Sequence, residues 1–430
     1  MRPSLTAVAA GAALTVAMAG CSAGGPRPAV SSASAAPGGG AAASGGGASS
    51  AAAPPAAVAA VAGAPGCSTA TAPGPSLRGV ATPMTPVPAA PFGVTVSRDG
   101  RWAFVAFNGL AAIGVFRITG PGDPSLVRRV NTAQQPGGEA LTPDGRYLLA
   151  ADSADGAVVI SVSRAESGAA GALLGTLGTG VPGAAVEVAV SSDGRFAFVS
   201  VEDDGSIAVY DLRRALAGGF RASDLVGMIP AGVGPAGMAV SPDGRWLYVT
   251  SELESGATGI IRVGQGGRGT LTVINLDRAE TDPAGSVVSA VAAGCSPVRV
   301  TTSADGGVVW VTARGSDRLL GFSAARLRTD PAHSLVASVA VGEAPTGLAL
   351  VGGGKQIVVT DSNRFGASGA ASSLAVVSVA AALAGRPALL GYLRAGGFPR
   401  EMALEPGGRT LLVGNFTSRQ LEAVDVADVP

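Results

Sequence analysis

The stretch Gly237-Met-Ala-Val-Ser-Pro-Asp-Gly-Arg-Trp-Leu-Tyr-Val-Thr250 predicts a β-hairpin. A short apolar run ends at Ser-Pro-Asp-Gly, and a second run follows with Trp246, Tyr248 and Thr250 on one face. Asp-Gly between two β-rich runs is a strong hairpin signal, because the turn needs a positive φ that glycine adopts at little cost.

Versions of this hairpin recur seven times, beginning at Pro91, Pro136, Ala185, Pro235, Pro297, Pro345 and Pro399. The last two copies have glycine in place of the turn aspartate, which still permits a positive φ. A third alternating run follows each hairpin, such as 206–212, and a fourth follows in most copies, such as 335–341. Four short strands per repeat, at intervals of roughly 45 to 60 residues, predict the blades of a β-propeller.

The two ends of the repeat region complement each other. The seventh hairpin is followed by only one more run, 421–426, and the chain then ends at Pro430. At the other end, the run 77–82 has no hairpin of its own. We expect this N-terminal strand to complete the last blade, because the pairing removes an exposed sheet edge. Residues 76–430 are therefore predicted to form an all-β, seven-bladed propeller of four-stranded blades.

The repeat also resembles a known family. Its pattern, Pro-x-Gly-(Val/Met/Leu)-Ala-(Val/Leu)-Ser-Pro-Asp-Gly-Arg-x-Leu-Tyr-Val-Thr, is similar to the YVTN-type β-propeller repeat of bacterial surface proteins and lactonase-like propellers. The resemblance covers about residues 77–426. It implies the fold but no single function, because that family includes both enzymes and proteins of unknown binding role.

The N-terminus predicts an address outside the cytoplasm. Met1-Arg2 is followed by an apolar stretch, so residues 1–20 are predicted to be an export signal. Cys21 directly follows Ala-Gly, which resembles a bacterial lipobox and implies lipidation of that cysteine, as with palmitate. The mature protein would then be anchored by lipid to the bacterial cell membrane, on its extracytoplasmic side. The alternative is an ordinary secretory signal with an incidental cysteine.

Residues 21–75 consist mainly of Ala, Gly, Ser and Pro, and this composition predicts a disordered tether. Two further cysteines, Cys67 and Cys295, remain in the chain. Because exported proteins can keep disulfides, a Cys67–Cys295 bond is one hypothesis, and two free buried thiols are the other.

Charge and motif content exclude several classes of function. Thirty basic and thirty acidic residues cancel, so no basic surface indicates nucleic-acid binding. We expect a monomer. The chain has no Walker A loop and no His-Glu-x-x-His motif, and residues 76–430 contain no Gly-x-Ser-x-Gly elbow. The chain has a single histidine, His333. This count excludes a Ser-His-Asp triad and a multi-histidine metal site.

Charged residues interrupt a column of glycines near the start of each first strand. Glycine dominates the position two residues after the repeat proline, because backbones approach closely near the axis. Long charged side chains there or one residue away are costly unless paired or hydrated. The candidate ligand-binding residues are therefore Glu139, Glu187, Arg299, Arg400 and Glu401.

The chemistry of these side chains leaves two interpretations open. Arginines suit a carboxylate or phosphate, and glutamates can hold a divalent cation, although no cofactor is predicted. The alternative is an internal Glu–Arg network that fills the channel. Two enlarged loops after second strands, 253–269 and 362–373, belong on the same face as the charged column. They are either a lid or docking surface, or tolerated insertions.

The missing catalytic motifs favour a binding or scaffold module that displays its channel mouth to a protein, a glycan or a small molecule. The alternative is a lactonase-like hydrolase that opens an extracytoplasmic lactone. In that case Glu187 or Glu401 would act as base, with Arg299 or Arg400 stabilising the oxyanion.

Overall fold

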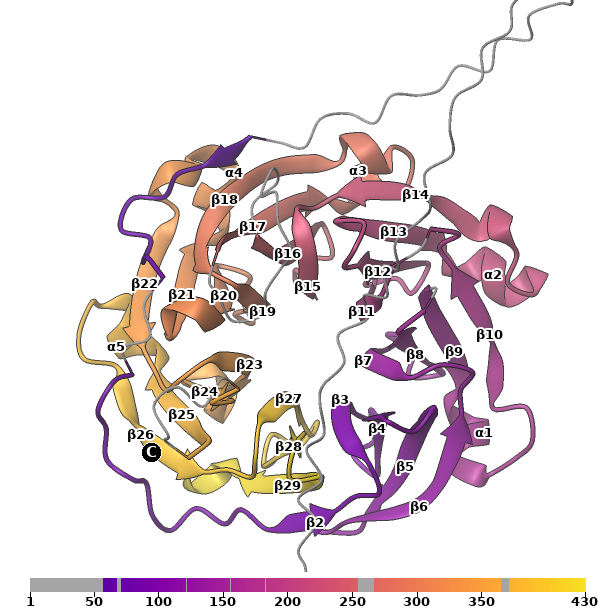
Figure 1. Ribbon diagram of the computed structural model, residues 1–430, viewed down its shortest axis with the longest axis horizontal. Coiled ribbons are helices and arrows are strands. Elements are labelled where there is room, and N and C mark those ends of the chain that lie inside the picture. The colour runs from indigo at the N-terminus through magenta and orange to yellow at the C-terminus, as the bar shows by residue number, and fades with distance from the viewer. Residues whose placement is uncertain are drawn as a thin grey trace, which may run out of the picture. The chain divides into compact units, whose positions relative to one another are not determined.

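The computed structural model describes residues 57–67, 71–120, 122–154, 156–181, 183–253, 267–364 and 371–430. The residues of the predicted export signal and Cys21 lie outside this part of the chain. The described residues form seven sheets arranged as blades around a common axis, as Figure 1 shows. The predicted all-β, seven-bladed propeller is confirmed.

The strands of blades 1 to 6 run from the centre outward in chain order. Blade 1 contains β3 (Ala90–Val96), β4 (Trp102–Asn108), β5 (Ala112–Ile118) and β6 (Pro124–Asn131). Blade 2 contains β7 (Pro136–Leu141), β8 (Tyr147–Asp152), β9 (Gly156–Ser161) and β10 (Leu173–Gly178). Blade 3 contains β11 (Ala185–Val190), β12 (Phe196–Val201), β13 (Ser206–Asp211) and β14 (Leu225–Pro230). Blade 4 contains β15 (Val233–Val240), β16 (Trp246–Leu253), β17 (Arg268–Asn275) and β18 (Val287–Cys295).

The remaining blades close the ring. Blade 5 contains β19 (Pro297–Thr302), β20 (Val308–Ala313), β21 (Arg318–Ser323) and β22 (Leu335–Ala340). Blade 6 contains β23 (Pro345–Val351), β24 (Gln356–Asp361), β25 (Ser373–Ser378) and β26 (Leu389–Arg394). Blade 7 contains β27 (Pro399–Leu404), β28 (Thr410–Asn415) and β29 (Gln420–Asp425), and its outermost strand is β2 (Met84–Pro86).

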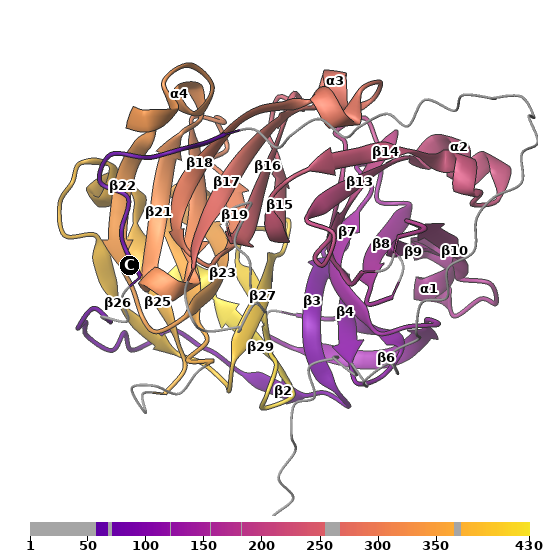
Figure 2. The same cartoon turned by 45° about the horizontal axis from the view of Figure 1, so that its top comes forward.

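Short helices occupy the links between third and fourth strands, at the outer rim (Figure 2). They are α1 (Val162–Ser167), α2 (Leu212–Gly218), α3 (Leu276–Ala279), α4 (Ala324–Thr329) and α5 (Val379–Leu383). Six 3-10 turns also occur: η1 (Ala222–Asp224), η2 (Pro283–Gly285), η3 (Arg314–Ser316), η4 (Pro331–His333), η5 (Gly352–Gly354) and η6 (Val426–Asp428). His333 lies exposed in η4, and its Nδ1 is hydrogen-bonded to the carboxylate of Asp330. No helix in the described ranges has the length and apolar character needed to cross a bilayer.

The repeated aspartates hold the hairpin turns. In blade 3 the Ser191 hydroxyl donates to Asp193 Oδ1 at 2.6 Å, and the same oxygen accepts from the Arg195 backbone N–H at 3.0 Å. Gly194 completes the turn at φ 72°. The same arrangement recurs at Asp99, Asp144, Asp243 and Asp305. These carboxylates satisfy turn N–H groups, as predicted from their repetition.

The apolar core is divided among the junctions between blades. Seven clusters of buried side chains each join two neighbouring blades, including the junction of blade 7 with blade 1. At that junction Phe107 and Phe116 of blade 1 pack with Leu412 and Leu421 of blade 7. Each sheet therefore buries both faces, and the ring leaves no junction open.

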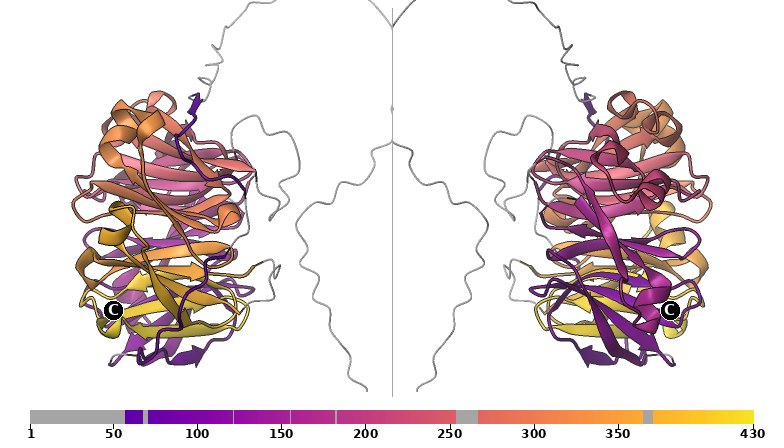
Figure 3. Two further views of the ribbon diagram at one scale, coloured as in Figure 1. Left: turned by 90° about the vertical axis from the view of Figure 1, so that its left-hand side faces the viewer. Right: turned by 90° about the vertical axis from the view of Figure 1, so that its right-hand side faces the viewer.

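The N-terminal arm, residues 57–67 and 71–86, runs along the outer edge of four blades. It is the indigo segment in Figure 1, and Figure 3 shows it crossing the outside of the orange and yellow blades. Strand β1 (Val58–Ala59) pairs in parallel with β18, so blade 4 has five strands. The Ala72 backbone N–H donates to Val341 O at 3.0 Å, and Leu77 N–H donates to Tyr392 O at 2.8 Å. Finally β2 pairs antiparallel with β29.

This arm differs from the sequence expectation in two places. The described residues before Ser76, which composition assigned to the tether, lie against blades 4 to 6. Their backbone groups pair with outer strands, a source of stabilisation that composition does not report. The closing strand is Met84–Pro86, whereas 77–82 was expected. Leu77 instead packs between blades 6 and 7. The carbonyls of Ala81 and Pro83, just before β2 in the chain, accept hydrogen bonds from backbone N–H groups of β29.

The arm is also fixed covalently. Cys67 and Cys295 form a disulfide with Cα atoms 5.3 Å apart, joining segments 228 residues apart in sequence. Cys295 is the last residue of β18, at the boundary between blades 4 and 5. The disulfide therefore fastens the start of the arm to the ring.

Candidate functional site

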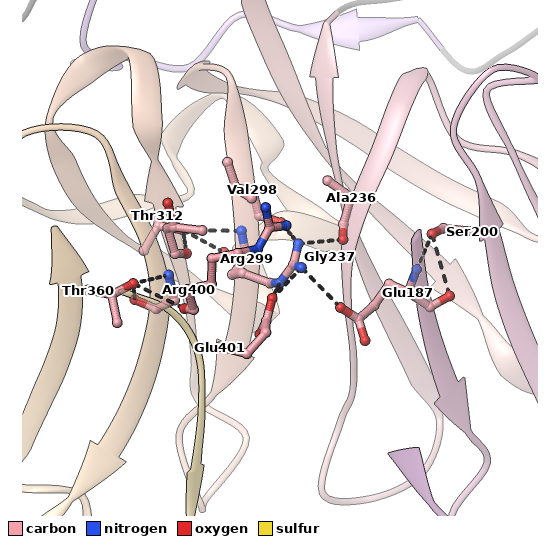
Figure 4. Close-up of polar contacts among 12 residues, drawn as sticks. Glu187, Ser200, Ala236, Gly237, Val298, Arg299, Thr312, Thr360, Arg400 and Glu401 are labelled. Atoms are coloured by element: carbon pink, nitrogen blue, oxygen red, sulfur yellow. Dashed lines mark hydrogen bonds and ion pairs between the residues drawn. The ribbon is translucent and has the colours of Figure 1, made fainter. Parts of the chain in front are cut away.

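The charged column lies on the innermost strands, where hydroxyl side chains hold neighbouring blades together. The Arg299 backbone N–H on β19 donates to Thr312 Oγ1 at 3.1 Å, and that hydroxyl donates to Thr346 O of blade 6 at 2.7 Å. Thr360 of blade 6 likewise donates to Arg400 O of blade 7 at 3.1 Å. These bonds fix the backbone from which the charged side chains enter the channel (Figure 4).

Three of the five predicted residues form one buried ion cluster. Arg299 Nε donates to Glu401 Oε1 at 2.6 Å, and its Nη2 also contacts that oxygen. Arg299 Nη2 lies 3.3 Å from Glu187 Oε2, and its Nη1 donates to Ala236 O at 2.7 Å. Figure 4 shows the guanidinium between the two carboxylates. Arg299 and Glu187 are only 6% and 9% exposed.

The ionisation of this cluster follows from burial and from mutual charge. Burial alone would lower the pKa of Arg299, but the carboxylates of Glu401 and Glu187 raise that pKa above its usual value. Burial raises the pKa of Glu187 to about 8, against the opposing effect of Arg299. Arg299 therefore stays cationic. Within the Arg299–Glu187 ion pair, Glu187 is the residue that takes up a proton.

Glu139, the fourth predicted residue, makes no contact of this kind. Both of its carboxyl oxygens are buried and lack a hydrogen-bond partner among the described residues. Burial raises the pKa of Glu139 well above its usual value, and the charges of Glu187 and Glu401 raise it further. Burial therefore favours the protonated form of Glu139.

No group of three or more His, Cys, Asp or Glu side chains with an arrangement suited to a metal ion occurs in the described ranges. Glu401 already accepts a hydrogen bond from Arg299, and Glu187 forms an ion pair with it.

Arg400, the fifth predicted residue, lies against aromatic rings. Its guanidinium carbon lies 3.8 Å from the centre of the Phe92 ring. The centres of the Phe398 and Phe416 rings are farther away, at 5.5 and 5.6 Å. Phe92 and Phe416 are themselves in edge contact, with centroids 6.5 Å apart. The ring faces stabilise the cation but offer it no hydrogen-bond acceptor.

A cavity of about 300 Å³ opens at the channel mouth, and every blade contributes at least one lining residue. Its charged lining residues are Arg299, Arg314, Arg364, Arg400, Glu202 and Glu252. Arg314 Nη2 donates to Glu252 Oε2 at 2.6 Å, which links blades 5 and 4. Arginine therefore outnumbers glutamate in the lining of this cavity.

A larger groove of about 780 Å³ lies elsewhere, between blades 2 and 3 at the hairpin turns. It is lined by turn residues such as Asp144 and Asp193, whose carboxylates already accept from their own turns. We consider the mouth cavity the better candidate site, because its buried polar groups are not engaged in holding hairpin turns, whereas those of the groove are.

Sequence reasoning found some of this site and missed some. The residues at or just after the ends of second strands that line the mouth are Asn108, Glu202, Glu252 and Arg314. Arg364 belongs to an enlarged loop that was recognised, but it was not singled out. Phe92 was missed, because a phenylalanine after the repeat proline reads as ordinary packing. Residues 254–266 and 365–370, the parts of the enlarged loops expected to form a lid or docking surface, lie outside the described part of the chain.

Comparison with known proteins adds information on the fold. No protein-family model matches the chain, and no curated protein sequence matches it. Among solved structures, a chain described as Kuenenia stuttgartiensis hydrazine synthase is similar with a TM-score of 0.62 and 17% identity, covering 82% of this chain and 99% of that one. A chain from a mitotic checkpoint complex is similar with a TM-score of 0.61 and 15% identity, covering 84% and 96%. At these identities the likeness concerns the fold alone. The chain is a seven-bladed β-propeller.

Proposed function

We propose that this protein is a binding module that takes its ligand at the channel mouth. The observation that carries the proposal is the cavity of about 300 Å³ to which all seven blades contribute. Cavities of this size, with a few convergent polar groups, are typical of small-molecule sites. A small molecule fits such a cavity better than a folded partner does, although a protein or glycan lying across the mouth would use the same face.

We further propose that the module works outside the cytoplasm as a monomer, held to the bacterial cell membrane by a lipid on Cys21. The export-like N-terminus supports this address. The Cys67–Cys295 disulfide supports it independently, because disulfides persist in oxidising compartments.

Ligand binding is tested on the mature protein. Native mass spectrometry detects any small molecule retained through purification, and thermal-shift measurements with a metabolite library identify ligands that stabilise the fold. A matched variant, Ser153→Trp, fills the mouth from an exposed lining position without changing charge. We expect it to abolish the stabilisation. A ligand that binds this variant as well as the wild type would contradict the proposal.

The address is tested by cell fractionation. We expect the wild type in the membrane fraction and Cys21→Ser in the soluble extracytoplasmic fraction. Intact-mass measurement should show an acylated N-terminus only in the wild type. An unmodified, soluble wild-type protein would contradict the anchoring.

A further inference from the structure

The guanidinium of Arg400 packs against aromatic rings and is paired with no carboxylate among the described residues. Its Nε is buried without a hydrogen-bond partner, and it forms no ion pair with any residue in the described ranges. Burial lowers the pKa of Arg400 to about 9, and repulsion from Arg299 contributes. The side chain is still protonated at neutral pH, so a positive charge lines the cavity.

The neighbouring charges do not neutralise Arg400. Arg299 forms ion pairs with Glu187 and Glu401, and Arg314 forms an ion pair with Glu252. Arg364 and Arg314 each add repulsion that lowers the pKa of Arg400. Glu401, a carboxylate that favours the charged form of Arg400, is already held by Arg299.

We propose that the ligand of this module is a small organic oxyanion, a carboxylate or phosphate ester, whose anionic group binds Arg400 and whose apolar part lies beside Phe92. The inference rests on the proposed function and specifies its ligand. A guanidinium presents a planar fork of N–H donors that matches both oxyanions. A cation would be repelled at this site, and a neutral ligand would leave the charge of Arg400 uncompensated.

Phe92 gives the site its second element of selectivity. It lines the cavity together with Arg400, and its ring packs against the guanidinium. An apolar group attached to the anion can therefore bury its surface against the Phe92 ring. Inorganic phosphate has no such group and should bind more weakly than its phenyl ester.

The test uses isothermal titration calorimetry on the mature protein at pH 7 and low salt. The probes are benzoate, phenyl phosphate, inorganic phosphate and the neutral benzyl alcohol. The variants are Arg400→Gln, which removes the charge, and Ser153→Trp, which fills the cavity. Arg213→Gln is the matched control, because Arg213 is an exposed arginine in the groove between blades 2 and 3. Circular dichroism checks folding, and Ala184→Trp, another lining position, replaces Ser153→Trp if that variant does not fold.

We expect benzoate or phenyl phosphate to bind the wild type at least tenfold more tightly than benzyl alcohol. Arg400→Gln should weaken that binding at least tenfold, and Arg213→Gln should leave it unchanged. Binding of both organic anions no better than benzyl alcohol, or equal binding to Arg400→Gln, would overturn the anion proposal. Tighter binding of inorganic phosphate than of phenyl phosphate would overturn the role of Phe92.

The test separates this inference from the function on which it rests. If a neutral ligand is blocked by Ser153→Trp but not by Arg400→Gln, the mouth is a binding site and the anion inference fails. If neither tryptophan variant affects any ligand that binds, both proposals fail.

Discussion

Arg299 and Glu401 form an ion pair between innermost strands of blades that are not neighbours. Arg299 Nε donates to Glu401 Oε1 at 2.6 Å, from β19 of blade 5 to β27 of blade 7, across 102 positions of sequence. Glu187 adds blade 3 to the same cluster. The ring is thus joined through its channel as well as through the apolar junctions between adjacent blades.

Replacing Arg299 by methionine is expected to destabilise the fold by roughly 3 to 5 kcal/mol, because Glu401 would stay buried without its counter-charge and both glutamates would lose their contact with Arg299. Urea unfolding measures the loss. The triple variant Arg299→Met/Glu187→Gln/Glu401→Gln should recover most of it, and Arg213→Met, at an exposed position, is the control. A single variant as stable as the wild type would show that the cluster does not stabilise the ring.

The disulfide should contribute to stability by fastening the N-terminal arm. Cys67→Ala/Cys295→Ala is expected to lower the free energy of unfolding by about 2 to 5 kcal/mol, because the bond closes a long loop in the unfolded chain. Thermal melts with and without reductant provide the measurement. Reductant should lower the melting temperature of the wild type and leave that of the double variant unchanged. Equal melting temperatures for the two proteins without reductant would contradict this expectation.

The closing strand should matter beyond the disulfide. Deleting residues 57–86 removes β2 and exposes the edge of β29. We expect a larger loss of stability than in the double-cysteine variant, and self-association through the open edge. Urea unfolding and light scattering after size exclusion test both points. A monomeric deletion variant, no less stable than the cysteine variant, would mean that blade 7 does not need its N-terminal strand.

The stability of blade 7 should depend on pH through Glu422. Burial raises the pKa of Glu422 from its ordinary 4.5 to about 7, although Asn415 Nδ2 donates to its Oε2 at 2.8 Å. The protonated acid is thus favoured on folding, so its stabilising effect is complete below pH 4.5 and is lost as pH rises through 7. The resulting loss in the free energy of unfolding, from below pH 4.5 to above pH 7, is up to about 3 kcal/mol.

Glu422→Gln cannot ionise and should therefore lose less stability between pH 5 and pH 8 than the wild type. Denaturant unfolding across this pH range measures the difference. Asp428→Asn, which removes an exposed carboxylate, controls for general charge effects. A variant with the same pH dependence as the wild type would rule out Glu422 as its source.

The hydrolase alternative makes a separate prediction. Glu187 and Glu401 are bonded to Arg299 and do not line the mouth cavity. We therefore expect no turnover of small lactones, with or without divalent metal, by the wild type or by Glu187→Gln and Glu401→Gln. A pH-stat assay on a lactone panel tests this. Turnover that is lost in either glutamine variant would replace the binding role with catalysis.

The sequence by itself determined the blades, because a blade is specified by interactions between residues close in the chain. Alternating apolar residues set the strands, and the Ser-Pro-Asp-Gly turns set the hairpins, as the bonds around Asp193 illustrate. The same repetition showed where charge replaced glycine, and so identified Arg299 and Arg400 as unusual.

The tertiary structure alone decided which of these charges meet. Arg299 reaches Glu401 only because the closed ring brings blades 5 and 7 to one axis, whereas Arg400 reaches Phe92 across the junction of blades 7 and 1. The strands β1 and β2 were placed in the same way, by free backbone groups on the outer strands rather than by their own sequence. Local hydrogen bonds and side-chain periodicity are encoded within a repeat, but contacts between distant repeats depend on the geometry with which the ring closes.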